Sequence, residues 1–576
     1  MKKFLLGVLI GLLFSGLALV VLLFAIARFA SRPPAIPGGS VLVYRLQGDV
    51  PEAPQVEIPL PFFERMSAPT VRDHWEMLRK AAADSRIRAL LLMPEGVGAG
   101  WAKIDEIRSG IEAFKRSGKP VYAFLRGPRA REYYLAAAAD RVYMPPEDLL
   151  DLKGLRAELM YLKGTLDKIG VNIEIQHVGK YKDAGDVLTR KGPTPETLEV
   201  INSILDDLYG QLVTGLGNAR RKTPEQMRAI IDQGPFTSKE ALAHGLVDGL
   251  RYQDQVYGEL KDKLKIGGEL HKVSLRDYFR ITPESVGIET GSRIALVAAE
   301  GDIIRGDAES PFGGQGFITS SGMTRLLQRV GSDRSIRGVI LRIDSPGGDG
   351  FASDEILREV RLLSKKKPLV VSMSDMAASG GYYMAMSGDP LLAYPGTFTG
   401  SIGVFYGKAD LRGLYDKLGI QKYVLTRGKF AGIDSDYVPM SDEGRKKLQA
   451  SIEEFYKSFV DIVAQSRKRT YPQIDAVAQG RVWLGNQAKA NGLIDQFGGI
   501  DRAIEIVKQK AGIPARESVR LVAYPPRRTI LDQLLSRQPA VSLPESRMFQ
   551  ALRRYSTRTW AEGGMMKMAP YTVEVK

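Results

Sequence analysis

The stretch YYMAMSGD (Tyr382 to Asp389) has an altered copy, YYLAAAAD (Tyr133 to Asp140), that lies 249 positions earlier in the chain. The surrounding sequences repeat at the same spacing, since DRSIRGVIL (Asp333 to Leu341) matches DSRIRALLL (Asp84 to Leu92). Similarity at a fixed offset is the signature of a duplicated structural unit. We therefore expect two tandem domains that share one fold.

The duplication extends over residues 38–272 and 290–512 and leaves residues 513–576 as an extension without a counterpart. Each copy alternates short β-branched runs, such as GVILRID (Gly338 to Asp344), with amphipathic stretches, such as ASDEILREVRLLSKK (Ala352 to Lys366). Strands that alternate with helices predict βαβ units and a mostly parallel sheet. The expected fold class is therefore α/β in both copies.

The first 30 residues predict an N-terminal transmembrane anchor. Lys2 and Lys3 precede an uncharged apolar run over residues 4–27. This run has the length of a spanning helix, whereas a cleavable signal has a shorter apolar core. The two lysines favour a cytoplasmic N-terminus and export of the remaining chain, although Arg28 and Arg32 weaken this preference. A cleaved signal peptide is the alternative interpretation.

Composition excludes several kinds of site. The chain has 576 residues and no cysteine, which excludes disulfides, thiolate metal sites and cysteine nucleophiles. Its formal net charge is +15, but the basic residues are scattered among acidic ones and form no nucleic-acid-binding motif, so no nucleic-acid partner is expected. The sequence also contains no metal-binding cluster and no phosphate-binding loop, and we expect no cofactor.

The two copies have lost different polar residues. Ser379 in the second copy aligns with Ala130 in the first, and Lys182 in the first copy aligns with Ala431 in the second. A duplicated enzyme reaches this state when one composite site, with one residue from each copy, is sufficient. The alignment therefore predicts that the Ser379 hydroxyl and the Lys182 amine meet. Independent drift at two unrelated loop positions is the alternative.

Ser379 needs a base, because a serine hydroxyl is a weak nucleophile until its proton is removed. The second copy contains no histidine, and among the four histidines of the chain only His177 lies close in sequence to Lys182. A lysine can serve instead when burial lowers its pKa toward neutrality, and Ser/Lys pairs are known variants of the catalytic triad. Lys182 is the favoured base, with His177 and Lys180 as rivals.

Glycines around Ser379 predict donors for the oxyanion that forms in acyl transfer. SPGGDG (Ser345 to Gly350) follows a predicted strand, and Gly380 follows Ser379 directly. Without a Cβ, a glycine N–H can approach a ligand closely, and such groups stabilise developing negative charge. We expect the N–H groups of Gly348 and Gly380 to serve here. Ser401 offers a further hydroxyl that could orient the lysine.

Five stretches of this chain occur together in one known family. They are RIDSPGGDG, DMAASGGYYMA, TGSIGVF, GRVWLGNQAKANGLID and VGKYKDAGD. Together they resemble the signal peptide peptidase A (protease IV) family in its long, duplicated form, over about residues 40–512 and the anchor. The resemblance implies two tandem Clp-protease/crotonase-like domains and a membrane-anchored serine endopeptidase that degrades cleaved signal peptides and similar hydrophobic peptides. It also implies a homotetramer on the periplasmic side of the bacterial inner membrane.

The same resemblance makes Ser379 the nucleophile, Lys182 the general base and Ser401 the serine that coordinates the lysine. The sequence KDAGDV departs from the family pattern, which is K-S-A followed by Glu-Pro, and Asp183 directly follows the base where the family has a serine. An inward-pointing carboxylate would hold the lysine in its protonated form. We expect the Asp183 side chain to point to solvent.

Two other functions fit parts of the sequence. A crotonase-type acyl-CoA enzyme would use the same oxyanion turn with carboxylates in place of a nucleophile, and a non-catalytic membrane scaffold would keep the site as a relic. The reciprocal loss of Ser379 and Lys182, together with the anchor, favours the peptidase. The sequence leaves open whether the pair forms within one chain or between subunits.

Overall fold

The computed structural model describes residues 34–54, 68–288, 291–307, 316–526 and 564–568, together with Gly7, Gly11 and residues 14–16. The anchor predicted over residues 1–30 lies outside the described residues except at those five positions. Within the described part of the chain, no helix combines the length and the apolar character needed to cross a bilayer.

Both copies are built on the same parallel sheet. The strand order is β8-β4-β3-β2-β1-β9 in the first copy and β20-β16-β15-β13-β10-β21 in the second, where β17 and β19 extend the sheet beside β15. The first-copy strands are β1 (Ser40–Gly48), β2 (Ile87–Val97), β3 (Val121–Phe124), β4 (Arg141–Met144), β8 (Gly249–Leu250) and β9 (Lys272–Ser274). The second-copy strands are β10 (Ser292–Glu300), β13 (Ile336–Ser345), β15 (Leu369–Ala378), β16 (Leu391–Ala393), β17 (Phe398–Gly400), β19 (Val482–Leu484), β20 (Gln496–Phe497) and β21 (Val519–Tyr524).

The helices occupy equivalent places in the two copies. In the first copy α2 packs against α3, as α12 packs against α13 in the second. The first copy contains α2 (Val71–Ala83), α3 (Trp101–Lys115), α4 (Ala130–Ala136), α5 (Lys163–Ile169), α6 (Asp186–Thr189), α7 (Pro195–Arg220), α8 (Pro224–Ile231), α9 (Ser238–Ala243), α10 (Gln253–Lys263), α11 (Leu275–Phe279) and the short 3-10 helix η1 (Pro283–Val286). The second contains α12 (Ser320–Ser332), α13 (Gly350–Ser364), α14 (Gly380–Met384), α15 (Arg412–Lys417), α16 (Asp442–Arg467), α17 (Tyr471–Asp475), α18 (Gly485–Ala490) and α19 (Ile500–Ala511).

The longest helix of each copy begins where its sequence supplies a cap. In α7 the Thr194 hydroxyl accepts the N–H of Thr197, and Pro195 occupies the first turn. In α16 the Ser441 hydroxyl accepts the N–H of Gly444. A hydroxyl cap satisfies a backbone donor that the helix leaves unpaired, and proline suits the first turn because it has no N–H to satisfy.

The second copy continues past the boundary expected at residue 512. β21 pairs in parallel with β10, at the place that β9 occupies beside β1 in the first copy. The comparison of the two copies in sequence did not assign β21 to the second copy. An edge strand is held by main-chain hydrogen bonds, which almost any residue can make, so β21 and β9 need not be similar in sequence. Part of the extension is therefore the edge of the second sheet.

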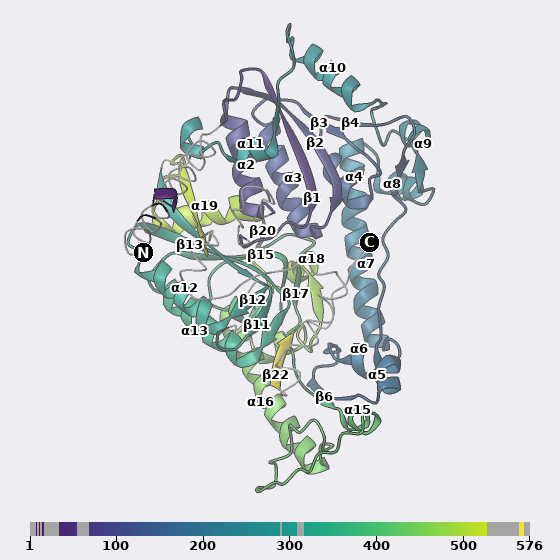
Figure 1. Ribbon diagram of the computed structural model, residues 1–576, viewed down its shortest axis with the longest axis vertical. Coiled ribbons are helices and arrows are strands. Elements are labelled where there is room, and N and C mark those ends of the chain that lie inside the picture. The colour runs from purple at the N-terminus through teal and green to yellow at the C-terminus, as the bar shows by residue number, and fades with distance from the viewer. Residues whose placement is uncertain are drawn as a thin grey trace.

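A third sheet joins the two copies, in the order β12-β11-β14-β22-β18-β6. It contains β11 (Asp302–Ile304), β12 (Phe317–Thr319), β14 (Gly347–Asp349), β18 (Val404–Asp410), β22 (Gly564–Met568) and, from the first copy, β6 (Asn172–Val178), while β5 (Leu149–Leu150) pairs separately with β7 (Phe236–Thr237). β6 of the first copy pairs antiparallel with β18 of the second, and this pairing joins the two copies. Figure 1 shows β6 at the lower end of the molecule, far from the first-copy sheet at the top, with α7 running between the two regions.

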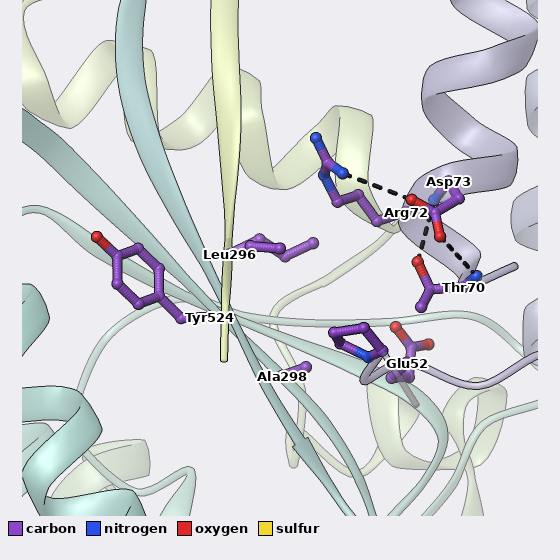
Figure 2. A pocket seen from close by; sticks show the side chains of 9 residues that line it. Glu52, Thr70, Arg72, Asp73, Leu296, Ala298 and Tyr524 are labelled. Atoms are coloured by element: carbon purple, nitrogen blue, oxygen red, sulfur yellow. Dashed lines mark hydrogen bonds and ion pairs between the residues drawn. The ribbon is translucent and has the colours of Figure 1, made fainter. Parts of the chain in front are cut away.

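A small pocket lies where the two copies meet (Figure 2). Its first-copy wall includes Thr70, Arg72 and Asp73, which are joined by hydrogen bonds at the start of α2, and its second-copy wall includes Leu296 and Tyr524. The lining contains none of the predicted site residues. This pocket is therefore separate from the site described below.

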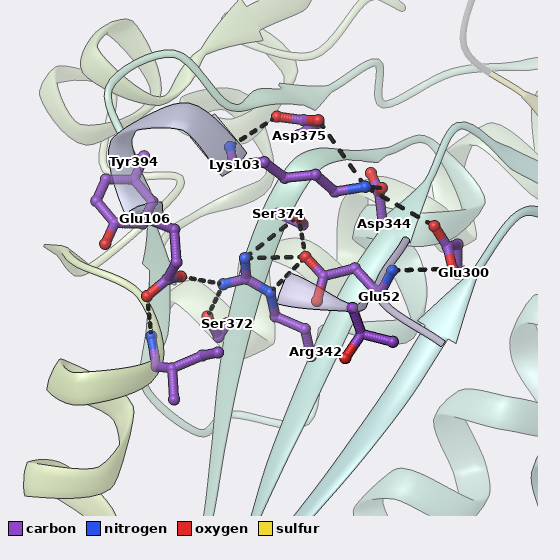
Figure 3. Close-up of polar contacts among 12 residues, drawn as sticks. Glu52, Lys103, Glu106, Glu300, Arg342, Asp344, Ser372, Ser374, Asp375 and Tyr394 are labelled. Atoms are coloured by element: carbon purple, nitrogen blue, oxygen red, sulfur yellow. Dashed lines mark hydrogen bonds and ion pairs between the residues drawn. The ribbon is translucent and has the colours of Figure 1, made fainter. Parts of the chain in front are cut away.

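Buried ion pairs hold the same junction together (Figure 3). The Arg342 side chain is 0 % exposed, and its guanidinium lies 3.0 Å from both the Glu52 and the Glu106 carboxylates of the first copy. It also donates to the hydroxyls of Ser372 at 2.8 Å and Ser374 at 3.2 Å. Because charge buried without a partner is costly, the network ties the two copies together in one arrangement.

A second group of charges lies near the ends of β10, β13 and β15, the last of which leads to Ser379. The Asp375 carboxylate accepts the backbone N–H groups of Gly100 and Lys103, at 2.8 and 2.9 Å, at the start of α3. The Lys103 ammonium lies 2.7 Å from Asp344, and burial alone would lower the pKa of Lys103, but Asp344, Asp375 and Glu300 raise it well above its ordinary value. The first copy is thus fastened directly to the end of β15.

Candidate active site

Ser379 occupies a sharp turn between β15 and α14. Its backbone has φ 52° and ψ −113°, an uncommon conformation for a residue with a Cβ. The turn is held on both sides, since the Ser379 N–H donates to the Gly400 carbonyl at 2.8 Å and the Ser379 carbonyl accepts from Tyr383 at 2.8 Å. Gly381 is required here, because a Cβ at this position would lie 2.7 Å from the Ser345 carbonyl oxygen.

Lys182 reaches this turn from the first copy. β6 ends at Val178, and the chain then turns so that the Lys182 side chain enters the second copy. The Lys182 Nζ atom lies 2.9 Å from Ser379 Oγ. The exposed fractions of the two residues are 1 % and 0 %, so the contact is shielded from water. The pair forms within a single chain.

Ser401 completes the surroundings of the amine. The Lys182 Nζ atom donates to the Ser401 hydroxyl at 3.0 Å and to the Ser401 carbonyl at 3.1 Å. Ser401 is itself fully buried, and its N–H donates to the Arg481 carbonyl at 2.8 Å. These contacts aim the amine at Ser379 Oγ.

The segment from Gln479 to Arg481 supports the lysine, and its part in the site was not predicted from the sequence. The Tyr181 N–H donates to the Gln479 carbonyl at 2.8 Å. A Cβ on Gly480, whose φ is +78°, would lie 2.5 Å from the Lys182 Cβ. In the sequence, the Gly480-Arg481 pair at the start of GRVWLGNQAKANGLID marks this segment. The sequence does not show that the segment contacts Lys182, so its role could not be inferred.

The glycines predicted as oxyanion donors lie on neighbouring elements. Gly348 is in β14 with φ +151°, and a Cβ there would overlap the Ile303 carbonyl oxygen. Gly380 is the first residue of α14, and β14 packs against α14. The Gly347 N–H donates to the Ser345 hydroxyl at 3.2 Å, which stabilises the turn that presents Gly348.

The equivalent place in the first copy has different contacts. Ala130 stands at the start of α4, where the second copy has its serine turn. In the first copy the Glu132 carboxylate accepts the Val97 N–H at 2.8 Å, in the region that corresponds to the oxyanion turn. A carboxylate at this position would repel an oxyanion.

The two rival bases are directed elsewhere. His177 lies on β6 with its side chain exposed, and none of the described hydrogen bonds joins it to Ser379. The Lys180 side chain is also exposed, and its Nζ atom lies 3.5 Å from the Tyr181 hydroxyl. Lys182 is the basic side chain that the described structure brings to Ser379.

The expectation that Asp183 points to solvent is wrong. Asp183 is 7 % exposed, and its Oδ2 atom accepts a hydrogen bond from the Thr197 hydroxyl at the start of α7. Burial raises the pKa of the Asp183 carboxyl to about 6, although the bond from Thr197 lowers it. The loop turns inward because Lys182 and Ala184 on either side are also buried.

Within the described residues, no group of three or more acidic or histidine side chains is placed to hold a metal ion. The chemistry that the site offers is that of an amine beside a hydroxyl. This pairing suits the transfer of an acyl group through a serine ester.

Comparisons with known proteins identify a family and several similar proteins. The chain matches the model of peptidase family S49 over residues 113–267 and 361–514. It is 36% identical over 504 residues to the chloroplastic serine protease SPPA of Arabidopsis thaliana, with 86% of this chain and 73% of that protein covered. It is 32% identical over 485 residues to Protease 4 of Salmonella typhi, with 82% and 76% covered. Among solved structures, ClpP1 from Listeria monocytogenes aligns with 36% of this chain and 91% of its own, at 14% identity and a TM-score of 0.22.

The family model matches once in each copy, and the two matches together cover more than half of the chain. Both protein relatives span most of its length and are named as proteases. The chain therefore belongs to peptidase family S49 and is a serine peptidase of the long, duplicated kind.

Proposed function

We propose that this serine peptidase is a membrane-anchored endopeptidase in which Ser379 is the nucleophile and Lys182 the general base. The observation that carries the proposal is the 2.9 Å distance between Lys182 Nζ and Ser379 Oγ in a buried site. Burial disfavours a charged amine in general, and a lysine must be neutral to accept a proton. Ser401 orients this amine through its hydroxyl.

The reaction proceeds in two acyl-transfer steps. As Ser379 Oγ attacks the peptide carbonyl carbon, its proton passes to Lys182, and the N–H groups of Gly348 and Gly380 receive the oxyanion. Breaking of the C–N bond returns that proton to the leaving amine and leaves an ester on Ser379. Water then attacks the ester with Lys182 again as the base, which releases the carboxylic acid and restores the serine.

The substrates that we propose are cleaved signal peptides and similar hydrophobic peptides. The apolar run over residues 4–27 supports an anchor in the bacterial inner membrane, with the catalytic body on the periplasmic side. An enzyme held at this surface meets hydrophobic peptides where they leave the bilayer. We further propose that each chain contains two Clp-protease/crotonase-like copies and that four chains assemble into a homotetramer.

A fluorophosphonate probe tests the proposed function. We expect one covalent adduct per chain, located on Ser379 by mass-spectrometric peptide mapping, and hydrolysis of a leucine- and alanine-rich peptide that the adduct abolishes. The same preparation should leave acyl-CoA thioesters unchanged. An adduct on another serine, or acyl-CoA turnover that persists after labelling, would contradict the proposal.

Replacement of Asp183 by Asn is expected to change the pH dependence of peptide hydrolysis. The pKa of Asp183 is raised to about 6, so the carboxyl is charged above that pH. Its negative charge then favours the ammonium form of the adjacent base, and a higher pH is needed to obtain the neutral amine. In Asp183→Asn, the pH at which kcat/KM reaches half its maximum should therefore fall by roughly 0.5–1 unit.

Asp186→Asn is the matched control for this measurement. It removes the same charge three positions later, at the first residue of α6, where the Asp186 carboxylate lies 3.8 Å from the Arg190 guanidinium. We expect a smaller shift in this variant. An unchanged profile in Asp183→Asn, or equal shifts in both variants, would show that the Asp183 carboxylate does not act on the base.

A further inference from the structure

The turn that packs against Lys182 has an uncommon backbone conformation. Gln479 has φ +51°, in the left-handed region that residues with a Cβ seldom adopt. The next residue is fixed within the second copy, because the Gly480 N–H donates to the Ile402 carbonyl at 2.7 Å. A conformation of this kind persists only where the surrounding structure holds it. The contacts of the Gln479 side chain therefore indicate what holds the turn.

The amide nitrogen of Gln479 joins this turn to two helices of the second copy. Its Nε2 atom donates to Asp475 Oδ1 in α17 at 2.7 Å and to the Tyr456 hydroxyl in α16 at 2.9 Å. The Gln479 backbone N–H donates to the same hydroxyl at 3.2 Å, and that hydroxyl donates to Asp475. Tyr456 is buried, and α16 packs against both α17 and β6. The turn is thus fixed to the framework of the second copy.

The oxygens of Gln479 bind the loop that carries the base. The side-chain Oε1 atom accepts the Lys180 N–H at 3.3 Å, and the main-chain carbonyl accepts the Tyr181 N–H at 2.8 Å. A Cβ on Gly179 would lie 2.6 Å from the Gln479 carbonyl carbon, so the two backbones are in close contact. Both residues that directly precede Lys182 are therefore bonded to Gln479.

We propose that Gln479, held by Tyr456 and Asp475, is a positioning residue that sets where the Lys182 amine stands relative to Ser379. The inference rests on the proposed peptidase function and adds a residue that acts only through the base. The first copy supplies the amine and the second copy supplies the hydroxyl, so the loop before Lys182 needs a fixed point on the second copy. A misplacement of about 1 Å can slow a reaction about 100-fold, and loss of this fixed point should therefore slow proton transfer.

The rate at which a fluorophosphonate labels Ser379 tests this inference. Gln479→Met keeps the approximate length of the side chain and removes its hydrogen bonds, and we expect it to lower the second-order labelling rate by about 10–100-fold. Tyr456→Phe removes one hydroxyl from the same network and should lower the rate about threefold. A thermal melt of each variant measures its folding separately.

Gln473→Met is the matched control. Gln473 lies in α17, as Asp475 does, and its side chain accepts the Thr470 N–H at 2.9 Å. None of the described hydrogen bonds joins the Gln473 side chain to the loop that carries Lys182. This variant loses a helix cap, so it should melt at a lower temperature but label at the wild-type rate.

The same substitution in a Lys182→Met background separates positioning from a general loss of structure. There, Gln479→Met should change the labelling rate by less than about twofold, because the base that it positions is absent. Equal slowing with and without Lys182, or wild-type labelling in Gln479→Met, would overturn the inference. Wild-type labelling in Tyr456→Phe would overturn the part assigned to Tyr456.

These outcomes are distinguishable from a failure of the proposed function. If Lys182→Met alone labels at the wild-type rate, Lys182 is not the base, and its positioning by Gln479 falls with it. If Lys182→Met labels slowly while Gln479→Met labels at the wild-type rate, only the positioning role is wrong.

Discussion

Replacement of Lys182 by Met is expected to lower kcat for peptide hydrolysis by about 10³–10⁴-fold, because no other base reaches Ser379 Oγ in the described structure. Lys182→Arg should lose as much, since a guanidinium stays protonated and cannot accept the serine proton. Met fills a similar volume without a charge, so the variant should remain folded. Initial rates and a thermal melt measure the two properties separately.

Lys180→Met is the control for this prediction. It removes the same charge two positions earlier, from an exposed side chain, and its kcat should stay close to that of the wild type. Ser379→Ala combined with Lys182→Met should be no less active than Ser379→Ala alone, because the two residues act as a unit. A Lys182→Met protein with more than a tenth of the wild-type kcat would refute the assignment of the base.

Replacement of Arg342 by Met is expected to destabilise the junction of the two copies by about 3–5 kcal/mol. The guanidinium is fully buried and contacts the Glu52 and Glu106 carboxylates at 3.0 Å. Its removal leaves two buried carboxylates without their counter-ion. Urea unfolding followed by tryptophan fluorescence should show a lower midpoint for the transition that separates the copies.

Two further variants make this measurement specific. Arg325→Met removes an arginine from an exposed pair with Asp307, and its unfolding midpoint should match that of the wild type. Arg342→Met combined with Glu52→Gln and Glu106→Gln removes the uncompensated charge and should recover at least half of the lost stability. If Arg342→Met alone unfolds at the wild-type urea concentration, the network does not hold the junction.

Much of the fold was predictable because its signals are local. A β-branched run such as GVILRID forms β13, and the amphipathic run after it forms α13, since the spacing of apolar residues sets which face is buried. Because the two copies repeat at a fixed offset, a strand or helix predicted in one copy is also expected at the equivalent position in the other. β21 was missed because its main-chain pairing with β10 leaves no comparable pattern in the side chains.

The surroundings of the site were less predictable. Gly480 looks like an ordinary loop glycine until the fold places it against Lys182, 298 positions earlier in the chain. Asp183 looks like a solvated loop acid, but the start of α7 covers it and Thr197 bonds to it. In both cases the missing information is the identity of a distant neighbour.

The sequence by itself determined that the chain is a duplicated α/β protein. It also identified a serine that only the second copy retains and a lysine that only the first copy retains. Only the tertiary structure decided that these two side chains meet within one chain, because β6 of the first copy pairs with β18 of the second. Strand pairing uses backbone groups that every residue except proline carries in full. For that physical reason, the sequence of β6 contains little information about the strand that it will join.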